Sequence, residues 1–282
     1  MSKRASVCTF AFALVCMLLT VPATLKADTI ILEGSDAIGF HCALGDLGAC
    51  TYRDQVWTAI GGASPLPIAV FGNTVNGTPV TSGTHPVADF SSVAAAGNLN
   101  NYIALYFLAV NGCCTEDDSL ITAPGAQAAV AAFLATGRTV MIENYTGGSA
   151  WDFAVGAGGM GNANVAGVGG ALGGPICSDG ETVTALGMAN GFTQPPALGC
   201  WTHQAYNEAF FAPLGFTESF YDADPAFAAD NPGVTGPFSS LLSTGPTITG
   251  STPEPSSVVL FGTVAVLVVG LKFRRRLTSK GI

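Results

Sequence analysis

Positive charge is almost absent from the middle of this chain. Eight of its ten Lys and Arg residues lie before residue 28 or after residue 271, which leaves only Arg53 and Arg138 in between. Residues 28–250 hold 18 of the 19 Asp and Glu residues and carry a formal charge of −16. Such a surface repels phosphate backbones, so we expect no nucleic-acid partner. It suits a soluble exported protein, or one that attracts divalent cations or cationic partners.

Familiar catalytic and metal-binding patterns are also missing. The chain has no Gly-x-Ser-x-Gly string, no Cys-x-x-Cys pair and only three histidines, His41, His85 and His203. A serine-hydrolase triad and a zinc ribbon are therefore not indicated, although a zinc site at His41 and Cys42 stays open. No complete catalytic motif remains, which favours a non-catalytic protein.

The N-terminal residues have the pattern of a secretory signal peptide. Lys3 and Arg4 form a positive n-region, and the apolar residues 7–21 are too few for a comfortable transmembrane helix. Small residues follow, so signal peptidase has candidate cleavage sites after Ala23 and after Ala27. We assign residues 1–27 to the signal peptide and expect the rest of the chain to be exported.

The C-terminal end carries three features in order. Pro253, Glu254 and Pro255 come first, and an apolar run follows them. At about 1.5 Å per helical residue, a transmembrane helix over residues 256–273 can just cross a bilayer core of about 30 Å. A basic cluster then stays on the cytoplasmic side. It consists of Arg274, Arg275 and Arg276.

Residues 252–277 thereby resemble the PEP-CTERM sorting tail of Gram-negative bacteria. In that family an exosortase-type enzyme recognises the tail at the inner membrane, and the protein ahead of it is delivered to the cell surface or extracellular matrix. The resemblance implies an inner-membrane intermediate, a body over residues 28–242 and a spacer over residues 243–251. An ordinary C-terminal transmembrane anchor is the alternative.

Cysteine usage fits an oxidising compartment. Six cysteines lie in the body: Cys42, Cys50, Cys113, Cys114, Cys177 and Cys200. An even number in an exported protein favours three disulfides, and local pairing joins Cys42 with Cys50 and Cys177 with Cys200. The adjacent Cys113 and Cys114 either form a vicinal bridge or reach separate partners.

The first half of the body alternates strand and helix patterns. Apolar runs predict strands at 29–32, 66–71, 102–110 and 139–142, and helical spacing predicts helices over 51–60 and 127–135. Strand, helix, glycine, strand is the order of a βαβ unit. The sequence therefore predicts an α/β fold with a mainly parallel sheet flanked by helices and long glycine-rich loops.

Residues 102–114 and 126–142 also resemble flavodoxin-like and class I amidotransferase-like α/β domains. The amidotransferase nucleophile pattern is Gly-x-Cys-x-Gly, but the sequence here is Gly112-Cys113-Cys114-Thr115-Glu116. Because the second glycine is missing and the thiols lie in an oxidising compartment, we do not expect a cysteine nucleophile.

The second half is less regular. Residues 156–174 contain nine glycines, which predicts a long loop. Ser178 and Glu181 have the spacing of a capping box at the start of a helix, and a further helix is predicted over residues 204–211. Near Ser243 the composition predicts the beginning of a spacer.

Acidic residues follow three of the predicted strands. Because parallel sheets bind ligands beyond the carboxyl ends of their strands, these carboxylates are candidates for a ligand or Ca²⁺ site, with no other cofactor indicated. They are Asp36, Glu116, Asp117, Asp118, Glu143 and Asp152. Tyr145 and Trp151 beside them suit a sugar, such as an extracellular polysaccharide. Ordinary acidic turns are the alternative.

Two functions remain open on the sequence alone. The first is an exported surface or matrix protein with a non-catalytic binding or structural role. The second is a secreted α/β hydrolase with a carboxylate-lined site at the strand ends. A cluster of Asp36, Glu143 and one acid from residues 116–118 would favour the hydrolase, whereas scattered surface carboxylates would remove its support.

Overall fold

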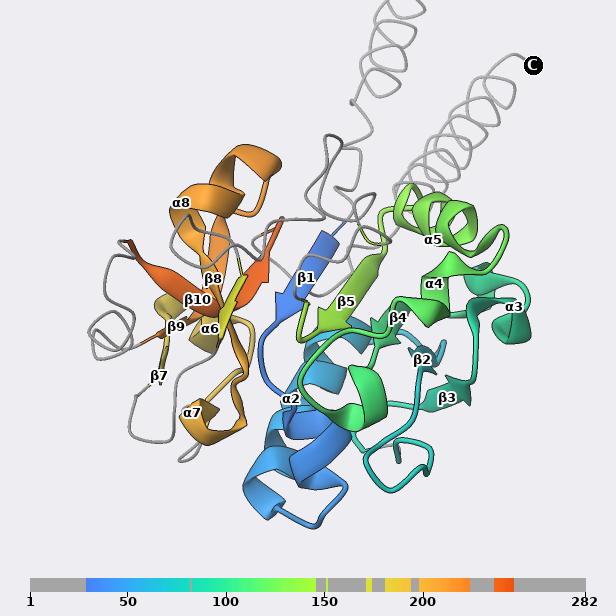
Figure 1. Cartoon of the computed structure of the whole chain (residues 1–282), viewed down its shortest axis with the longest axis horizontal. Coiled ribbons are helices and arrows are strands. Elements are labelled where there is room, and N and C mark those ends of the chain that lie inside the picture. Colours follow the sequence, from blue (N-terminus) through green and yellow to red (C-terminus); the bar gives the residue numbers. More distant parts are fainter. Residues whose placement is uncertain are drawn as a thin grey trace, which may run out of the picture. The chain divides into compact units, whose positions relative to one another are not determined.

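In the part of the body that the structure describes, ten strands join in one mixed sheet (Figure 1). The computed structural model describes residues 29–81, 83–145, 151, 171–173, 181–193, 198–223 and 236–245, all within the contact unit Lys26–Ser251. The predicted signal peptide and sorting tail, including the span 256–273, lie outside the described residues. Among the residues described, no helix is long and apolar enough to cross a bilayer.

The first five strands run parallel in the spatial order β3-β2-β4-β5-β1. Their bounds are β1 (Thr29–Glu33), β2 (Ile68–Phe71), β3 (Val87–Phe90), β4 (Ala104–Phe107) and β5 (Thr139–Glu143). β1, β2, β4 and β5 are buried along their whole length, as expected for strands covered on both faces. The predicted α/β fold with a parallel sheet flanked by helices is confirmed for this half.

Helices cover both faces of the parallel strands. They are η1 (Ala37–Cys42), α2 (Leu47–Gly61), α3 (Val93–Ala96), η2 (Leu99–Asn101), η3 (Val110–Gly112), α4 (Ser119–Thr122) and α5 (Ala126–Leu134). Alternate residues of β1 enter different cores, because successive side chains of a strand point to opposite faces. Ile30 and Leu32 join the core of α5, whereas Ile31 joins the core of α2.

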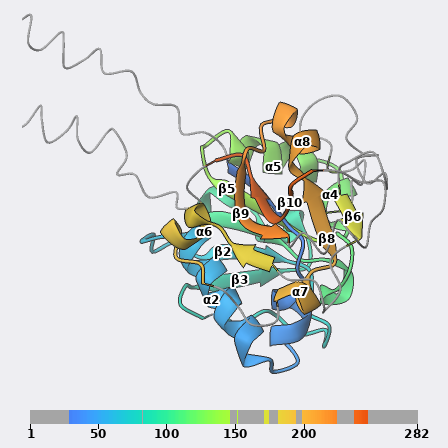
Figure 2. The same cartoon turned by 90° about the vertical axis from the view of Figure 1, so that its left-hand side faces the viewer.

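The second half of the chain extends the sheet with antiparallel strands (Figure 2). Its elements are β6 (Ala171–Gly173), β7 (Glu181–Val183), α6 (Ala185–Ala189), α7 (Leu198–Trp201), β8 (Gln204–Asn207), α8 (Glu208–Phe211), η6 (Ala212–Leu214), β9 (Glu218–Ala223) and β10 (Phe238–Ser243). β10 pairs antiparallel with β1, β8 and β9. β1 therefore lies in the interior of the sheet, between β5 and β10.

Several predictions for this half are wrong. Glu181 begins strand β7 and caps no helix, since the Thr184 side chain caps α6. Residues 204–207 form β8, and the helix begins only at Glu208. Ser243 is the last residue of a buried strand, so the predicted spacer overlaps the fold there. Residues 171–173 of the predicted glycine-rich loop form β6.

Candidate functional site

Two buried glutamates lie side by side where β1 and β5 end. Glu33 and Glu143 are register partners in these parallel strands, and both side chains are completely buried. The Glu33 carboxylate accepts hydrogen bonds from the Ser35 hydroxyl (2.9 Å) and the Tyr106 hydroxyl (2.5 Å). Glu143 is among the residues predicted from the sequence. Glu33 is not, although an acid directly after the apolar run 29–32 is a usable signal.

The Glu143 carboxylate binds backbone rather than side chains. It accepts hydrogen bonds from the backbone N–H of Ala109 (2.9 Å) and of Gly39 (3.4 Å). These two residues lie in different segments, after β4 and within η1. Glu143 therefore fixes both segments against the end of β5.

Burial dominates the ionisation of both acids. Loss of hydration raises the pKa of Glu33 from 4.5 to about 7. Burial also raises the pKa of Glu143 well above its usual range, with a further contribution from the charge of Glu33. Burial therefore favours the protonated form of both carboxyl groups.

Asp36 lies between two histidines. Its carboxylate is 1% exposed, with Oδ1 3.3 Å from His41 Nε2 and Oδ2 3.0 Å from His203 Nε2. The hydrogen bond that the Asp36 carboxylate accepts from His203 raises the pKa of His203 more than the partial burial of the imidazole lowers it. The side chains of His41 and His203 are 27% and 35% exposed, so they separate the buried carboxylate from solvent.

Backbone pairing brings His203 to Asp36 from the far half of the chain. Ser35 and Thr202 form an isolated antiparallel bridge. The Asp36 N–H donates to the main-chain oxygen of Trp201 (2.8 Å), and the His203 N–H donates to that of Gly34 (2.7 Å). Gly34 is required for this approach, because a Cβ there would lie 2.0 Å from the backbone oxygen of Gln204.

A tight loop after β4 carries Cys113 and Cys114 to the same place. An antiparallel bridge between Ala109 and Glu116 closes the loop. Asn111, Gly112 and Cys114 adopt positive φ angles of 51°, 69° and 76°. The loop crosses η1 backbone to backbone, since a Cβ on Gly112 would lie 2.2 Å from the Gly39 oxygen.

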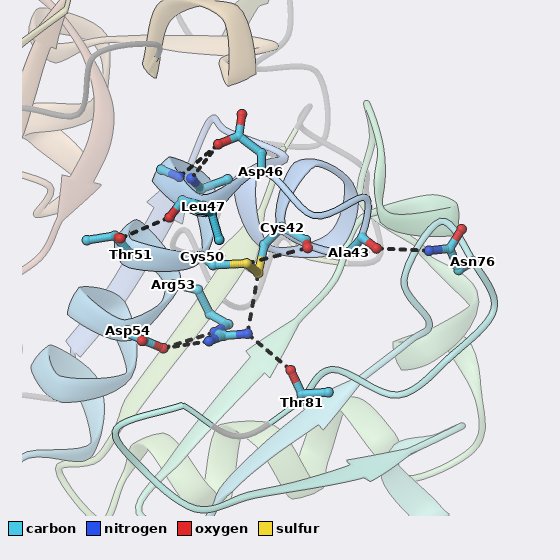
Figure 3. The surroundings of a disulfide bond; sticks show 12 residues. Cys42, Ala43, Asp46, Leu47, Cys50, Thr51, Arg53, Asp54, Asn76 and Thr81 are labelled. Carbon is cyan, nitrogen blue, oxygen red and sulfur yellow. Dashed lines mark hydrogen bonds and ion pairs between the residues drawn. A yellow bond between two sulfur atoms is a disulfide. The ribbon is translucent and has the colours of Figure 1, made fainter.

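Disulfide bonds fix both cysteine-bearing segments. Cys42 pairs with Cys50 as predicted, which links η1 to α2 beside Arg53 (Figure 3). Cys113 and Cys114 form the vicinal bridge, one of the two predicted alternatives. Cys200 is also disulfide-bonded, and its predicted partner Cys177 lies outside the described residues. A zinc site at His41 and Cys42 is wrong for this form of the protein, because Cys42 is oxidised.

The remaining predicted ligand residues serve different roles. Glu116 is buried at the base of the loop after β4. Asp117 accepts a hydrogen bond from the Ser119 N–H (2.9 Å), and Asp118 directly precedes α4, so both lie at the start of that helix. Asp152 lies outside the described residues. The structure therefore places Glu143 beside Glu33 and brings Asp36 close enough for its charge to act on both glutamates.

Asn144 is an unusual residue at the end of β5. It is fully buried, has a positive φ of 51°, and donates its backbone N–H to the main-chain oxygen of Glu33 (2.5 Å). Neither polar atom of its side-chain amide has a hydrogen-bond partner in the described part of the chain. Burying an unpaired amide costs about 1 to 3 kcal/mol. A ligand or water molecule that pairs with the amide would offset this cost.

No protein-family model, curated protein or solved structure matches the chain. The geometry at the ends of β1, β4 and β5 is therefore the basis for assigning a function to the body.

Proposed function

We propose that this chain is an exported bacterial protein that a PEP-CTERM-like tail directs to the cell surface or extracellular matrix, with a body that has a non-catalytic binding role. The observation that carries the export proposal is the oxidised state of the body's described cysteines, which are Cys42, Cys50, Cys113, Cys114 and Cys200. Stable disulfides belong to compartments outside the cytoplasm. The tail pattern at residues 252–277 supports the same destination.

The buried acids support binding rather than catalysis. The carboxylate oxygens of Glu33 and Glu143 already accept hydrogen bonds from the protein, so these side chains hold the surrounding segments in place. The Asn144 amide offers one acceptor and two donors to a neutral polar ligand. A sugar unit of an extracellular polysaccharide has matching hydroxyl groups, and the body's charge of −16 disfavours an anionic ligand.

Cell fractionation tests the destination. Full-length protein and a variant truncated before Thr252 are expressed in a bacterium that has an exosortase-type enzyme. We expect the full-length chain to pass through the inner membrane to the surface or medium, and the truncated chain to miss the surface. Permanent retention of a product that includes Arg274 to Arg276 in the inner membrane would contradict sorting and favour an ordinary anchor.

A secreted hydrolase is the second candidate, and one observation favours it. Asp36 holds His203 through Nε2, which leaves Nδ1 of a half-exposed imidazole to activate a water molecule as a general base. Hydrolysis of chromogenic esters or glycosides by the wild type, lost in a folded His203→Gln variant, would establish this function. Wild-type protein and His203→Gln with equal, background rates would support the binding role.

A further inference from the structure

The vicinal cysteines lie beside two further potential metal ligands. Ligand atoms of Asp36, Cys113, Cys114 and His203 all lie within 4.8 Å of one another. In a tetrahedral zinc site, bonds of about 2.0 Å to nitrogen and 2.3 Å to sulfur separate the ligand atoms by about 3.3 to 3.8 Å. Small side-chain movements would therefore bring the four groups to the spacing of a metal site.

The fold positions these groups without a metal. Asp36 and His203 are placed by backbone hydrogen bonds to Trp201 and Gly34. The cysteine loop is closed by its own antiparallel bridge and is held against η1 by the close contact at Gly112. Because three segments already converge, a bound cation would require little reorganisation of the backbone.

The oxidation state of the cysteines controls whether they can act as ligands. Thiolates bind metals, whereas the sulfur atoms of a disulfide have no such charge. Two thiolates, an imidazole and a carboxylate form a set of N, O and S donors that suits Zn²⁺ or Cd²⁺ better than Ca²⁺ or Mg²⁺. The acidic surface of the body raises the local concentration of any cation.

We propose that Asp36, Cys113, Cys114 and His203 form a redox-gated binding site for a thiophilic divalent cation, closed in the oxidised protein and open once the vicinal disulfide is reduced. A thiol reductant supplies two electrons and two protons, so that the bridge becomes two thiols and the reductant becomes a disulfide. Binding of the cation then releases both thiol protons to solvent. This metal site would give the protein a second, metal-bound state. The proposal does not depend on the binding role proposed above.

Titration with Zn²⁺ and Cd²⁺ tests the proposal on the purified exported protein. The reductant is a water-soluble phosphine, which takes up oxygen from water as the disulfide becomes two thiols. We expect the reduced protein to bind about one Zn²⁺ per chain in competition with a chromogenic chelator. We also expect a thiolate-to-Cd²⁺ charge-transfer band in the ultraviolet. The oxidised protein should show neither signal.

Variants separate this site from the other cysteines. Cys42→Ser/Cys50→Ser keeps the vicinal pair and should bind Zn²⁺ after reduction, whereas Cys113→Ser/Cys114→Ser should not. His203→Gln keeps both thiols and should weaken binding by about tenfold or more. Circular dichroism verifies that each variant is folded. Undiminished Zn²⁺ binding by reduced Cys113→Ser/Cys114→Ser, or none by the reduced wild type, would overturn the proposal.

Discussion

At the scale of single residues, Glu33 connects more of the fold than any sequence pattern indicates. Its carboxylate binds Ser35 and Tyr106, while its main-chain oxygen accepts hydrogen bonds from the Asn144 N–H and the Tyr206 hydroxyl (3.0 Å). These partners come from four different parts of the chain. Breaking such a buried network costs more than losing one surface hydrogen bond, because the groups left behind cannot bind water.

Stability should fall as pH rises. Burial raises the pKa of Glu33 and of Glu181 from 4.5 to about 7, so between these values the folded protein binds protons that the unfolded chain has lost. The free energy of unfolding is therefore highest below pH 4.5 for these groups and decreases until about pH 7, by roughly 3 kcal/mol for each acid. The raised pKa of His203 acts in the same direction. Denaturant unfolding at pH 5 and pH 8 measures the difference.

Glu33→Gln is the control for this pH dependence. Glutamine keeps a hydrogen-bonding oxygen at the same place and does not titrate, so the variant should lose part of the difference between pH 5 and pH 8. A wild-type protein more stable at pH 8 than at pH 5 would show that the buried acids are not the protonated groups we infer.

We expect Asn144 to lower the stability of the free protein, because its side-chain amide is placed for ligand binding. Asn144→Gly removes the unpaired amide, and it also removes the strain of a positive φ at a residue with a side chain. We therefore expect a higher unfolding temperature and a free energy of unfolding larger by at least about 1 kcal/mol. Asn144→Ala removes only the amide and should be about 1 kcal/mol less stable than the glycine variant. If both variants are strongly destabilised, the amide has a stabilising partner in the free protein.

At the scale of elements, the loop of residues 109–116 crosses η1 so closely that Gly112 should tolerate no side chain. Gly112→Ala introduces a Cβ 2.2 Å from the Gly39 oxygen at a φ of 69°, so it combines backbone strain with a steric clash. We expect a loss of about 2 to 5 kcal/mol in urea unfolding. Gly77→Ala is the matched control, because Gly77 has a φ of 67° with nothing within 4 Å, and it should cost only about 1 kcal/mol.

The disulfide between η1 and α2 should matter more for stability than the vicinal one. Cys42 and Cys50 close a loop with a sequence separation of 8, whose removal by serine substitution should cost about 2 to 3 kcal/mol. The bridge between Cys113 and Cys114 closes almost no loop, so its loss restores less freedom to the unfolded chain. Equal losses in the two double-serine variants, measured by denaturant unfolding, would contradict this ranking.

The helices and strands that the sequence predicts correctly are those with a clear local apolar pattern. α2, β2, β4, α5 and β5 each have a clear apolar period or run, and the structure contains all of them. The sequence predicts a helix over residues 204–211, but residues 204–207 form β8. Pairing of β8 with β10 and β6 decided the outcome instead.

The site was predictable only in part for the same reason. Asp36 and Glu143 follow predicted strands, so the rule that ligands bind beyond strand ends identifies both. The position of His203 beside Asp36 depends on an antiparallel bridge between segments that are distant in sequence. The register of β1 against β5 places Glu33 next to Glu143, and no spacing in the sequence encodes that register.

At the scale of the whole molecule, the distribution of charge and the oxidation state of the cysteines both fit the proposed export. The acidic stretch lies between a basic N-terminal pattern and a basic C-terminal cluster, and its described cysteines are oxidised. The proposed export, with the arginines left inside, would account for both observations, since basic flanks stay cytoplasmic and disulfides form outside.

Intact mass spectrometry of protein recovered from the cell surface or medium, alkylated without reduction, tests this most directly. We expect a chain that begins after Ala23 or Ala27, lacks Arg274 to Arg276, and carries no alkylated cysteine. Recovery of a chain that retains both termini and has six alkylated body cysteines would contradict signal-peptide cleavage, tail processing and the disulfide framework together.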